Sequence, residues 1–419
     1  MTLERPELFD LRTLLLFLGL CLCLLLFSLG REYRAYRDLT RFNDAVIEAE
    51  VVDQYLKRKE RRAYYVLKLK SRDGALFYTT ASEHLRNLLG YRLRLRVRTM
   101  GIGFREYLGG FFAYSDILRV ESNRSARIRL AEGIKMHHSD AEEGQLYAAL
   151  FTASPMSREL RQKLSALGIS HLLAISGFHL GVLSLIGFVL LAPLFTVVQS
   201  RWFPYVNRRR ELFVIVAVML TGYLLFLDYV PSLLRAYAML VIGYWLYDRG
   251  IKVVSMQTLG IAVALLLALW PRLGFSLGFW LSIAGVYFIL LFLRHFSHWH
   301  RGVQFAAIHV WVYLMMLPLS LYLFESFSLL HPASVVLSML FILFYPLALL
   351  AHVIGLESLL DGILPLLLRA PDVSSVSIGA EVLMLQLALA LGAFYRRGVL
   401  WLLLGVTLCV FVGAVYQVA

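Results

Sequence analysis

Long runs of apolar residues are the feature that most limits what this chain can fold into. Ten runs of roughly bilayer length occur, near residues 11–29, 171–198, 211–228, 232–247, 253–270, 273–293, 303–324, 333–355, 377–395 and 399–418. A helix needs about 20 mostly apolar residues to cross the hydrocarbon core of a bilayer. With 59% hydrophobic and 16% charged residues, the chain lacks the polar surface that an ordinary soluble protein needs. The sequence therefore predicts a polytopic α-helical membrane protein with about ten spans.

The first 30 residues form a separate segment. Leu11 to Leu29 is apolar apart from Arg12 and Thr13. A cleavable signal peptide is the competing interpretation, but no small-x-small cleavage site precedes Arg31, and the flank before the run mixes acids with arginines. We therefore interpret residues 1–30 as a retained N-terminal transmembrane anchor.

Residues 31–130 have a different periodicity. Apolar and polar residues alternate over 46–52, 63–70, 75–80 and 91–99, which is the period of β-strands with one buried face. This segment holds 22 Lys and Arg against 12 Asp and Glu, so most of the net charge of +13 belongs to it. The pattern predicts a small extramembrane all-β domain, a barrel or a sheet, near the N-terminus.

Four arginines alternate with apolar residues between Tyr91 and Thr99, so all four project from one face of the predicted strand. They are Arg92, Arg94, Arg96 and Arg98. One interpretation is a solvated edge strand whose charges prevent pairing with other sheets. The other is a stripe that faces phosphates, with aromatic side chains nearby on which bases can stack. Those aromatic residues are Tyr64, Tyr65, Phe77 and Tyr78.

Residues 131–170 are interpreted as an amphipathic connector, in which Ser157 to Leu167 has the periodicity of a membrane-surface helix. The pair His137-His138 invites a metal-site interpretation, but metal ligands need more partners than this polar stretch offers, so we favour a loop. All three cysteines lie inside apolar runs and predict no disulfide framework. With no P-loop and no HExxH motif in the sequence, we expect neither a cofactor nor a metal.

The apolar run that begins at His171 carries polar and small residues that a simple span does not need. Small residues recur at spacings of three and four, which predicts one seam along which a second helix can approach closely. They are Ala174, Gly177, Gly181 and Ser184. His171 and His179 are about 12 Å apart along a continuous helix, so we expect both imidazoles to face one crevice at two depths.

The segment from Gly168 to Gly181, GISHLLAISGFHLG, resembles the signature segment of the ComEC family, bacterial competence proteins that carry transforming DNA across the inner membrane. Pro231 to Met239 resembles the family's helix with an RAxxM string, and Gly278 to Ser282 resembles its GFQLS string, with Trp280 in place of glutamine. The channel or motif residues that the resemblance implies are His171, Ser176, Gly177, His179, Gly181, Arg235 and Met239.

The resemblance implies an inner-membrane channel that imports single-stranded DNA during natural competence. Residues 171–355 would form the channel core and residues 356–419 further transmembrane helices. It also implies an OB-like fold for residues 31–130, and it favours the DNA-binding interpretation of the four arginines. Expected partners are single-stranded DNA, membrane lipid, a periplasmic DNA receptor, a cytoplasmic motor or helicase, a separate nuclease and further copies of the chain.

Longer members of that family end in a metallo-β-lactamase-like domain with an HxHxDH zinc motif, thought to degrade one DNA strand. Here His298-Trp-His300 continues into Arg301-Gly302 without the acid and the third histidine. We therefore expect a translocator and not an enzyme, with no nuclease activity in this chain.

Arg235 is informative without the resemblance. An arginine about four residues into an apolar span is costly unless it pairs or faces water, so we expect it to point inward, with Asp228 as the nearest partner in sequence. Snorkelling of the side chain to the interface is the alternative. We expect Glu325 and His331 to lie at a membrane interface, near a span end.

Basic residues in the short connections set the expected orientation. They are Arg201 with Arg208 to Arg210, Arg249 with Lys252, and Arg294 with Arg301. If spans alternate, these connections share the cytoplasmic side, and the β domain lies outside the cytoplasm. Arg31, Arg34, Arg37 and Arg41 favour the opposite orientation, but basic residues folded into a large translocated domain weigh less than those in short loops.

Two other classes of function remain open. An intramembrane serine protease would use Ser176 with His179 or another histidine, although a serine and a histidine three apart on one helix are poorly placed for proton transfer and no GxSxG elbow exists. A transporter for a small or lipid-linked substrate is compatible with the composition.

Overall fold

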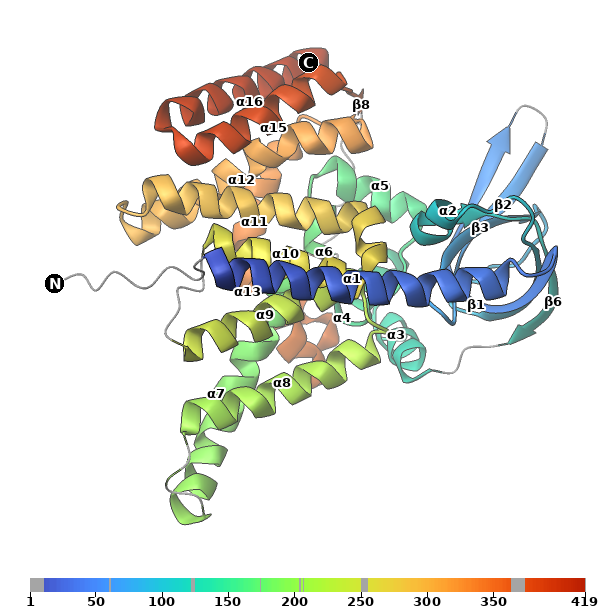
Figure 1. Cartoon of the computed structure of the whole chain (residues 1–419), viewed down its shortest axis with the longest axis horizontal. Coiled ribbons are helices and arrows are strands. Elements are labelled where there is room, and N and C mark those ends of the chain that lie inside the picture. Colours follow the sequence, from blue (N-terminus) through green and yellow to red (C-terminus); the bar gives the residue numbers. More distant parts are fainter. Residues whose placement is uncertain are drawn as a thin grey trace. The chain divides into compact units, whose positions relative to one another are not determined.

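The computed structural model describes residues 11–59, 62–121, 125–173, 175–202, 205, 207–249, 255–362 and 374–418. Its helices and strands are labelled in chain order in Figure 1. The chain divides into two compact units. Unit 1 comprises Met1–Gly133 with Ile261–Leu277, and unit 2 comprises Ile134–Gly260 with Gly278–Ala419.

Unit 1 holds a six-stranded sheet in the order β5-β3-β2-β1-β4-β6. Its strands are β1 (Asp44–Lys59), β2 (Arg62–Ser71), β3 (Leu76–Ser82), β4 (Arg92–Arg98), β5 (Phe111–Phe112) and β6 (Ser115–Glu121). The four alternating stretches of the sequence coincide with β1 to β4, so the predicted N-terminal β domain is confirmed. β5 pairs parallel with β3 and β6 pairs antiparallel with β4. Because only Ala113 and Tyr114 separate β5 from β6, this segment joins both edges of the sheet and closes it.

The interior of this sheet is filled by alternate side chains of its strands. In β4, Leu93, Leu95 and Val97 are buried while the arginines between them are exposed, as the alternation predicts. Phe77 of β3 is fully buried and its ring stacks on Phe111 at 5.4 Å between centroids. The stacking surface for bases that we expected at Phe77 is therefore wrong, because the side chain is part of the core.

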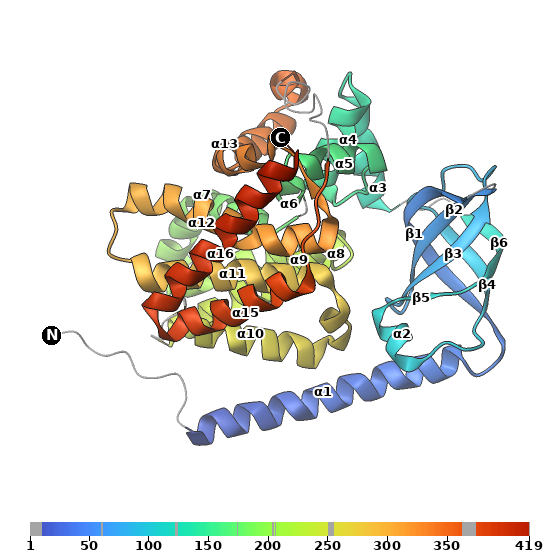
Figure 2. The same ribbon diagram turned by 90° about the horizontal axis from the view of Figure 1, so that it is seen from above.

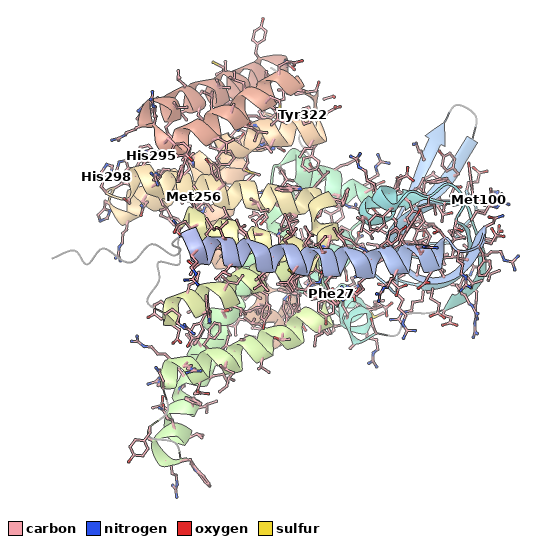
Figure 3. All side chains as sticks on the ribbon, in the orientation of Figure 1. Phe27, Met100, Met256, His295, His298 and Tyr322 are labelled. Atoms are coloured by element: carbon pink, nitrogen blue, oxygen red, sulfur yellow. The ribbon has the colours of Figure 1, made fainter. Side chains whose placement is uncertain are left out.

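Helix α1 (Leu11–Leu39) does not end where the apolar run ends. It continues nine residues beyond residue 30, so the expected start of the β domain at residue 31 falls inside a helix. The extension packs Ala35, Tyr36 and Leu39 against the core of the sheet, and the Tyr36 hydroxyl donates to the Ile102 carbonyl at 2.8 Å. The preceding half exposes large apolar side chains such as Phe27, which projects from α1 in Figure 3. A change from apolar to polar composition thus marks the end of the lipid-facing surface but not the end of the helix.

The connection between α10 (Met256–Leu269) and α11 (Leu277–Phe296) contains the 3₁₀ turn η1 (Pro271–Phe275), which belongs to unit 1. Arg272 fixes it there. Its guanidinium forms an ion pair with Glu32 of α1 at 2.6 Å and donates to the Tyr107 hydroxyl at 2.9 Å and to the Asp73 carbonyl at 3.1 Å. These contacts join η1, α1, α2 (Phe104–Gly109) and the β2–β3 turn.

Unit 2 is helical. Its larger elements are α4 (Ala141–Thr152), α5 (Arg158–Ala166), α7 (Gly177–Trp202), α8 (Arg208–Phe226), α9 (Pro231–Asp248), α11, α12 (Arg301–Phe324), α13 (Ser334–Val353), α15 (Ala380–Tyr395) and α16 (Arg397–Val418). Each of the ten apolar runs contains a helix, and the chain is a polytopic helical membrane protein.

Six of the described helices are long and apolar enough to cross a bilayer. They are Arg12–Leu39, Gly177–Trp202, Leu277–Phe296, Arg301–Phe324, His331–Val353 and Arg397–Val418. The expected ten spans are therefore not all supported. Helix α8 begins with Arg208 to Arg210 and Glu211, and α10 and α15 have only 14 and 16 residues.

Two helix clusters organise unit 2. Helices α15 and α16 lie side by side in both views and pack on α12 and α11, with Leu291, Met315 and Leu400 at the centre (Figures 1 and 2). Helices α7, α8 and α9 form the second cluster around Leu180, Val216 and Leu233. The signature segment leads into α7 and contributes the buried Ile175 and Leu180 to this second cluster.

Candidate functional site

The signature segment is not one continuous helix. Helix α6 (Ser170–Leu173) ends before Ala174, which lies outside the described residues, and α7 begins at Gly177 after the non-helical Ile175 and Ser176. His171 and His179 therefore lie on different helices, and the single-helix geometry that we expected for them is wrong. Periodicity cannot reveal such a break because apolar residues continue through it.

Ser176 and His179 form the N-terminal cap of α7. The backbone N–H of Ser176 donates to Nδ1 of His179 at 3.0 Å, and the Ser176 hydroxyl lies 3.1 Å from the same atom. Ser176 precedes the first helical residue, so His179 occupies the third helical position, from which a capping box reaches back to the cap N–H. The spacing between Ser176 and His179 thus has a local structural cause, since it satisfies a donor that a helix start leaves unpaired.

The ring of His179 is fully buried against two aromatic side chains. Its centroid lies 4.4 Å from that of Tyr345 and 5.6 Å from that of Phe341, both of α13 and both edge to face. Because a backbone N–H can only donate, Nδ1 is the acceptor and the ring proton is on Nε2. Among the described residues Nε2 has no hydrogen-bond partner. The imidazole is therefore neutral, and it is held by the Ser176 N–H on one side and by the aromatic rings of α13 on the other.

The small-residue seam exists only in part. A Cβ at Gly177 would lie 3.5 Å from Cβ of Ala236 on α9, and Ser184 is buried. Gly181, however, is exposed, with no atom within 4 Å of a Cβ built there, so its expected role in close packing is wrong. Gly187 takes that role, because a Cβ there would lie 2.9 Å from Met219 Cε and 3.4 Å from Val216 Cγ2 on α8.

Arg235 joins the second and third family-like strings. Its side chain is buried, as expected, but its partner is not Asp228. The guanidinium donates to the carbonyl of Gly278 at 2.6 Å and lies 5.7 Å above the ring of Phe279, both at the start of α11. The neighbouring Ala236 is the residue that faces Gly177. The three strings, which all lie between residues 168 and 282, thus meet where α7, α9 and α11 begin.

We call this meeting point the helix junction and define it by Ser176, Gly177, His179, Arg235 and Gly278. Met239 is half-buried one turn beyond Arg235 on α9, whereas Trp280 is exposed on α11. Among the described contacts of Arg235 there is no carboxylate, so the junction holds a buried, uncompensated positive charge. The start of α7 adds the positive end of a helix dipole.

The first half of the signature segment contacts His331, which sequence reasoning assigned to a membrane interface. Gly168 has φ +69°, and a Cβ there would lie 2.8 Å from Cε1 of His331, so glycine is required both by the backbone and by the ring. His331 is buried, stacks on Phe327 and lies 3.3 Å from the Tyr313 hydroxyl. His171 itself is exposed. No local signal in the sequence links residues so far apart.

The predicted arginine stripe is on one exposed face of β4, but β4 lies between β1 and β6 and is not an edge strand. The edge-protection interpretation is therefore wrong. Five acidic residues oppose the arginines across the two neighbouring strands. The pairs are Asp44–Arg98, Glu48–Arg94 and Glu50–Arg92 with β1, and Asp116–Arg96 and Glu121–Arg92 with β6. The stripe is thus embedded in a face of mixed charge.

A second, partly exposed face lies on β1, β2 and β3. We call it the tyrosine–lysine face and define it by Tyr55, Lys57, Tyr64, Lys68 and Tyr78. The register places these side chains opposite the buried ones of the same strands, and Lys68 lies 5.7 Å above the Tyr78 ring. The sequence indicated Tyr64 and Tyr78, but only strand pairing shows that lysines lie between them.

A family model described as Competence protein matches residues 152–418, which is more than half of the chain and includes the whole helix junction. No curated protein matches the chain, and no solved structure does.

The close contact at Gly187 predicts that two glycines of α7, Gly187 and Gly181, differ in how well they tolerate a larger side chain. We expect Gly187→Leu to destabilise the α7–α8 pair by about 1–3 kcal/mol through overpacking, whereas Gly181→Leu has open space and should leave assembly unchanged. Thermal unfolding of both purified variants in the same detergent measures this. Equal unfolding temperatures for the two variants would contradict the packing described here.

Proposed function

Because the chain belongs to the Competence protein family, whose role is in DNA uptake, we propose that it is an inner-membrane channel through which single-stranded transforming DNA reaches the cytoplasm. The observation that carries the proposal is the helix junction. Three separate helices start there around a buried arginine, and one of them, the candidate span Gly177–Trp202, follows a break in the signature segment. Broken helices are tolerated at membrane depth only where they are buried in protein or line a polar path.

The electrostatics of the junction suit a polyanion. Arg235 carries a charge that its described contacts, a carbonyl and an aromatic ring, do not neutralise. The N-terminal turn of α7 follows the capped Ser176, and the first turn of a helix carries N–H groups without intrahelical partners, which can bind an anion. A backbone phosphate that passes this point would meet both, and a permanently uncompensated arginine favours an anionic passenger over a neutral one.

The contacts of η1 support an orientation with the β domain outside the cytoplasm. Arg272 binds Glu32, where α1 leaves its apolar stretch, so η1 and the β domain belong to the same side of the membrane. Helix α11 then leads from η1 to Arg294 and Arg301, and basic residues in short connections stay cytoplasmic. Only α11 has to cross the membrane for this orientation to hold, whatever the total number of spans.

A single cysteine tests this orientation. Arg72 is exposed on the β2–β3 turn. We expect Arg72→Cys, in a chain whose three native cysteines are replaced, to react with a membrane-impermeant thiol reagent in intact spheroplasts. Labelling that appears only after lysis would reverse the topology.

We further propose that the β domain binds single-stranded DNA before it enters the channel. The closed strand order, with β1 between β2 and β4, resembles that of OB folds, which bind single strands through basic and aromatic surfaces. DNA binding by Arg92, Arg94, Arg96 and Arg98 stays a prediction, but their acidic neighbours weaken their attraction for phosphates. The tyrosine–lysine face has one acid, Asp53, opposite Lys68, but it combines its two lysines with three tyrosine rings, so we propose it as the main DNA surface.

Removing two positive charges from each face in turn shows which face binds the DNA. The full-length protein in nanodiscs should bind a single-stranded oligothymidine, and each phosphate contact contributes about −0.7 to the slope of log affinity against log salt. We expect Lys57→Gln with Lys68→Gln to flatten that slope by about 1.4. The matched pair, Arg94→Gln with Arg96→Gln, should change it less. A larger effect of the arginine pair would return the DNA surface to β4, and an unchanged slope in both would exclude phosphate binding by either face.

The serine protease remains the second candidate because one observation favours it. The Ser176 hydroxyl lies 3.1 Å from Nδ1 of His179, which is closer than we expected for two residues three apart. The same Nδ1 is taken by a backbone N–H, however, and the far side of the ring faces Tyr345 and Phe341 instead of an orienting carboxylate. A small-molecule or lipid transporter has no specific observation in its favour. A DNA receptor, a motor or helicase, a nuclease and further copies of the chain stay proposed partners.

A further inference from the structure

His138 lies in the loop that the sequence predicted, between α3 (Ala126–Met136) and α4, but its side chain is buried and does not face solvent. Helix α4, the end of α13 and the 3₁₀ turn η3 (Glu357–Leu360) shield it fully. Its ring stacks on Tyr147 of α4 at 4.5 Å between centroids, nearly parallel at 15°. A polar ring buried in this way needs hydrogen-bond partners for both nitrogens.

Both nitrogens of His138 have partners, and so have both of His352 at the end of α13. Nδ1 of His138 lies 2.9 and 3.1 Å from the two carboxylate oxygens of Asp361. Nε2 of His138 lies 3.2 Å from Nε2 of His352. Nδ1 of His352 lies 2.8 Å from the carbonyl oxygen of Ala348, one turn back on the same helix. The result is one hydrogen-bonded chain from a carboxylate, through two imidazoles, to a backbone carbonyl.

The hydrogen bonds of this network require one proton more than two neutral imidazoles and an ionised carboxylate carry. A carbonyl only accepts, so Nδ1 of His352 carries a hydrogen, and an ionised Asp361 requires the same of Nδ1 of His138. The two Nε2 atoms would then face each other with lone pairs at 3.2 Å unless a third hydrogen lies between them. Two neutral imidazoles bring only two hydrogens. If the third proton sits on Asp361 instead, the hydrogen bonds reverse along His138 and the total is unchanged.

We propose that His138, His352 and Asp361 form a proton-binding site, which holds one proton more than two neutral imidazoles and a carboxylate would hold. The bound proton balances the carboxylate, so the occupied site is neutral overall and suited to its buried position. When the proton leaves, an acceptor faces an acceptor and the negative charge of Asp361 is unbalanced. The contact between the two histidines then becomes repulsive.

The other charged or titratable groups around the site do not supply that proton. From α4, Glu143 is buried and accepts from the Gly362 N–H at 3.0 Å. Burial raises the pKa of the Tyr147 hydroxyl far above its ordinary value, and Asp361 and Glu143 raise it further, so Tyr147 stays neutral. Glu357 of η3 lies close enough to His352 for its negative charge to act on the imidazole. Three acidic groups, Glu143, Glu357 and Asp361, therefore lie around the two imidazoles.

A metal ion explains the geometry less well than a proton. Among the described residues no group of three or more histidine, cysteine, aspartate or glutamate side chains is placed to hold one. Two imidazoles alone leave most positions of a zinc ion open, although Asp361 and Ala348 occupy the places that outer partners of metal-bound histidines take. The 3.2 Å separation is that of an ordinary hydrogen bond.

Proton binding would control how the segment after α13 is held. Asp361 and Gly362 both contact the α3–α4 region, through His138 and Glu143 respectively. Loss of the proton removes the first attachment and leaves the second. We therefore expect the segment 354–362 to be protected from hydrogen exchange at low pH and to open as the pH rises.

Hydrogen–deuterium exchange of full-length protein in nanodiscs, corrected for the intrinsic pH dependence of exchange, tests the proposal. Between pH 5 and 9 the peptide that holds residues 354–362 should lose about tenfold protection, as expected for loss of a charge-assisted hydrogen bond, with one midpoint. His138→Phe and His352→Phe keep an aromatic ring but should abolish this pH dependence. His84→Phe, which changes an exposed histidine in unit 1, should retain it. Protection of this peptide that does not vary with pH in the wild type, or that varies equally in all variants, would overturn the proposal.

Asp361→Asn provides a second variant in case the phenylalanine variants do not assemble. The amide oxygen still accepts from His138, but the charge that balances the proton is gone, so the midpoint should fall by about 1 pH unit or more. An unchanged midpoint would overturn the proposal. So would metal analysis that finds about one transition metal per chain in the wild type and none in His138→Phe, because the bound cation would then be the metal.

Discussion

The break in the signature segment is the constraint on which the rest of the membrane unit depends. A membrane helix that starts after such a break has N–H groups in its first turn that lipid cannot satisfy, so the surrounding protein must supply partners or a polar path. Here His179 accepts the N–H of Ser176, and Arg235 donates to the carbonyl of Gly278 at the start of another helix. The first interaction caps α7, and the second joins α9 to the start of α11. Close contacts at Gly177 and Gly187 then set how near α9 and α8 approach.

Charge in this protein is informative only once its neighbours are known. The arginines of β4 dominate the sequence of the β domain, yet strand pairing places acids opposite them. Arg235 is a single residue in an apolar helix, yet among its described contacts no acid opposes it. If DNA passes the junction as proposed, the buried Arg235 would attract its phosphates more strongly than the arginines of β4, which acids oppose.

Local patterns in the sequence predicted the local structure well. Alternation identified β1 to β4 and the buried face of β4, and each apolar run proved to contain a helix. What failed depended on contacts between distant residues. The extension of α1 forms because Tyr36 and its neighbours pack on the sheet, and the burial of His331 depends on Gly168. The same is true of His138, whose partners are more than 200 residues away. The helix break was missed for a different reason, since its cap is short and its flanks stay apolar.

The central claim is that Ser176 and His179 shape a passage for DNA and do not form a catalytic pair. A capping box accepts glutamine at the position of His179, because its amide oxygen can receive the same N–H, whereas alanine cannot. The direct measurement compares DNA reaching the cytoplasm in His179→Gln and His179→Ala cells at equal abundance of the protein in the membrane. The account predicts that the glutamine variant retains much of the uptake and the alanine variant loses it. Complete loss in both, together with complete loss in Ser176→Ala, would contradict it and favour a serine nucleophile with its histidine base.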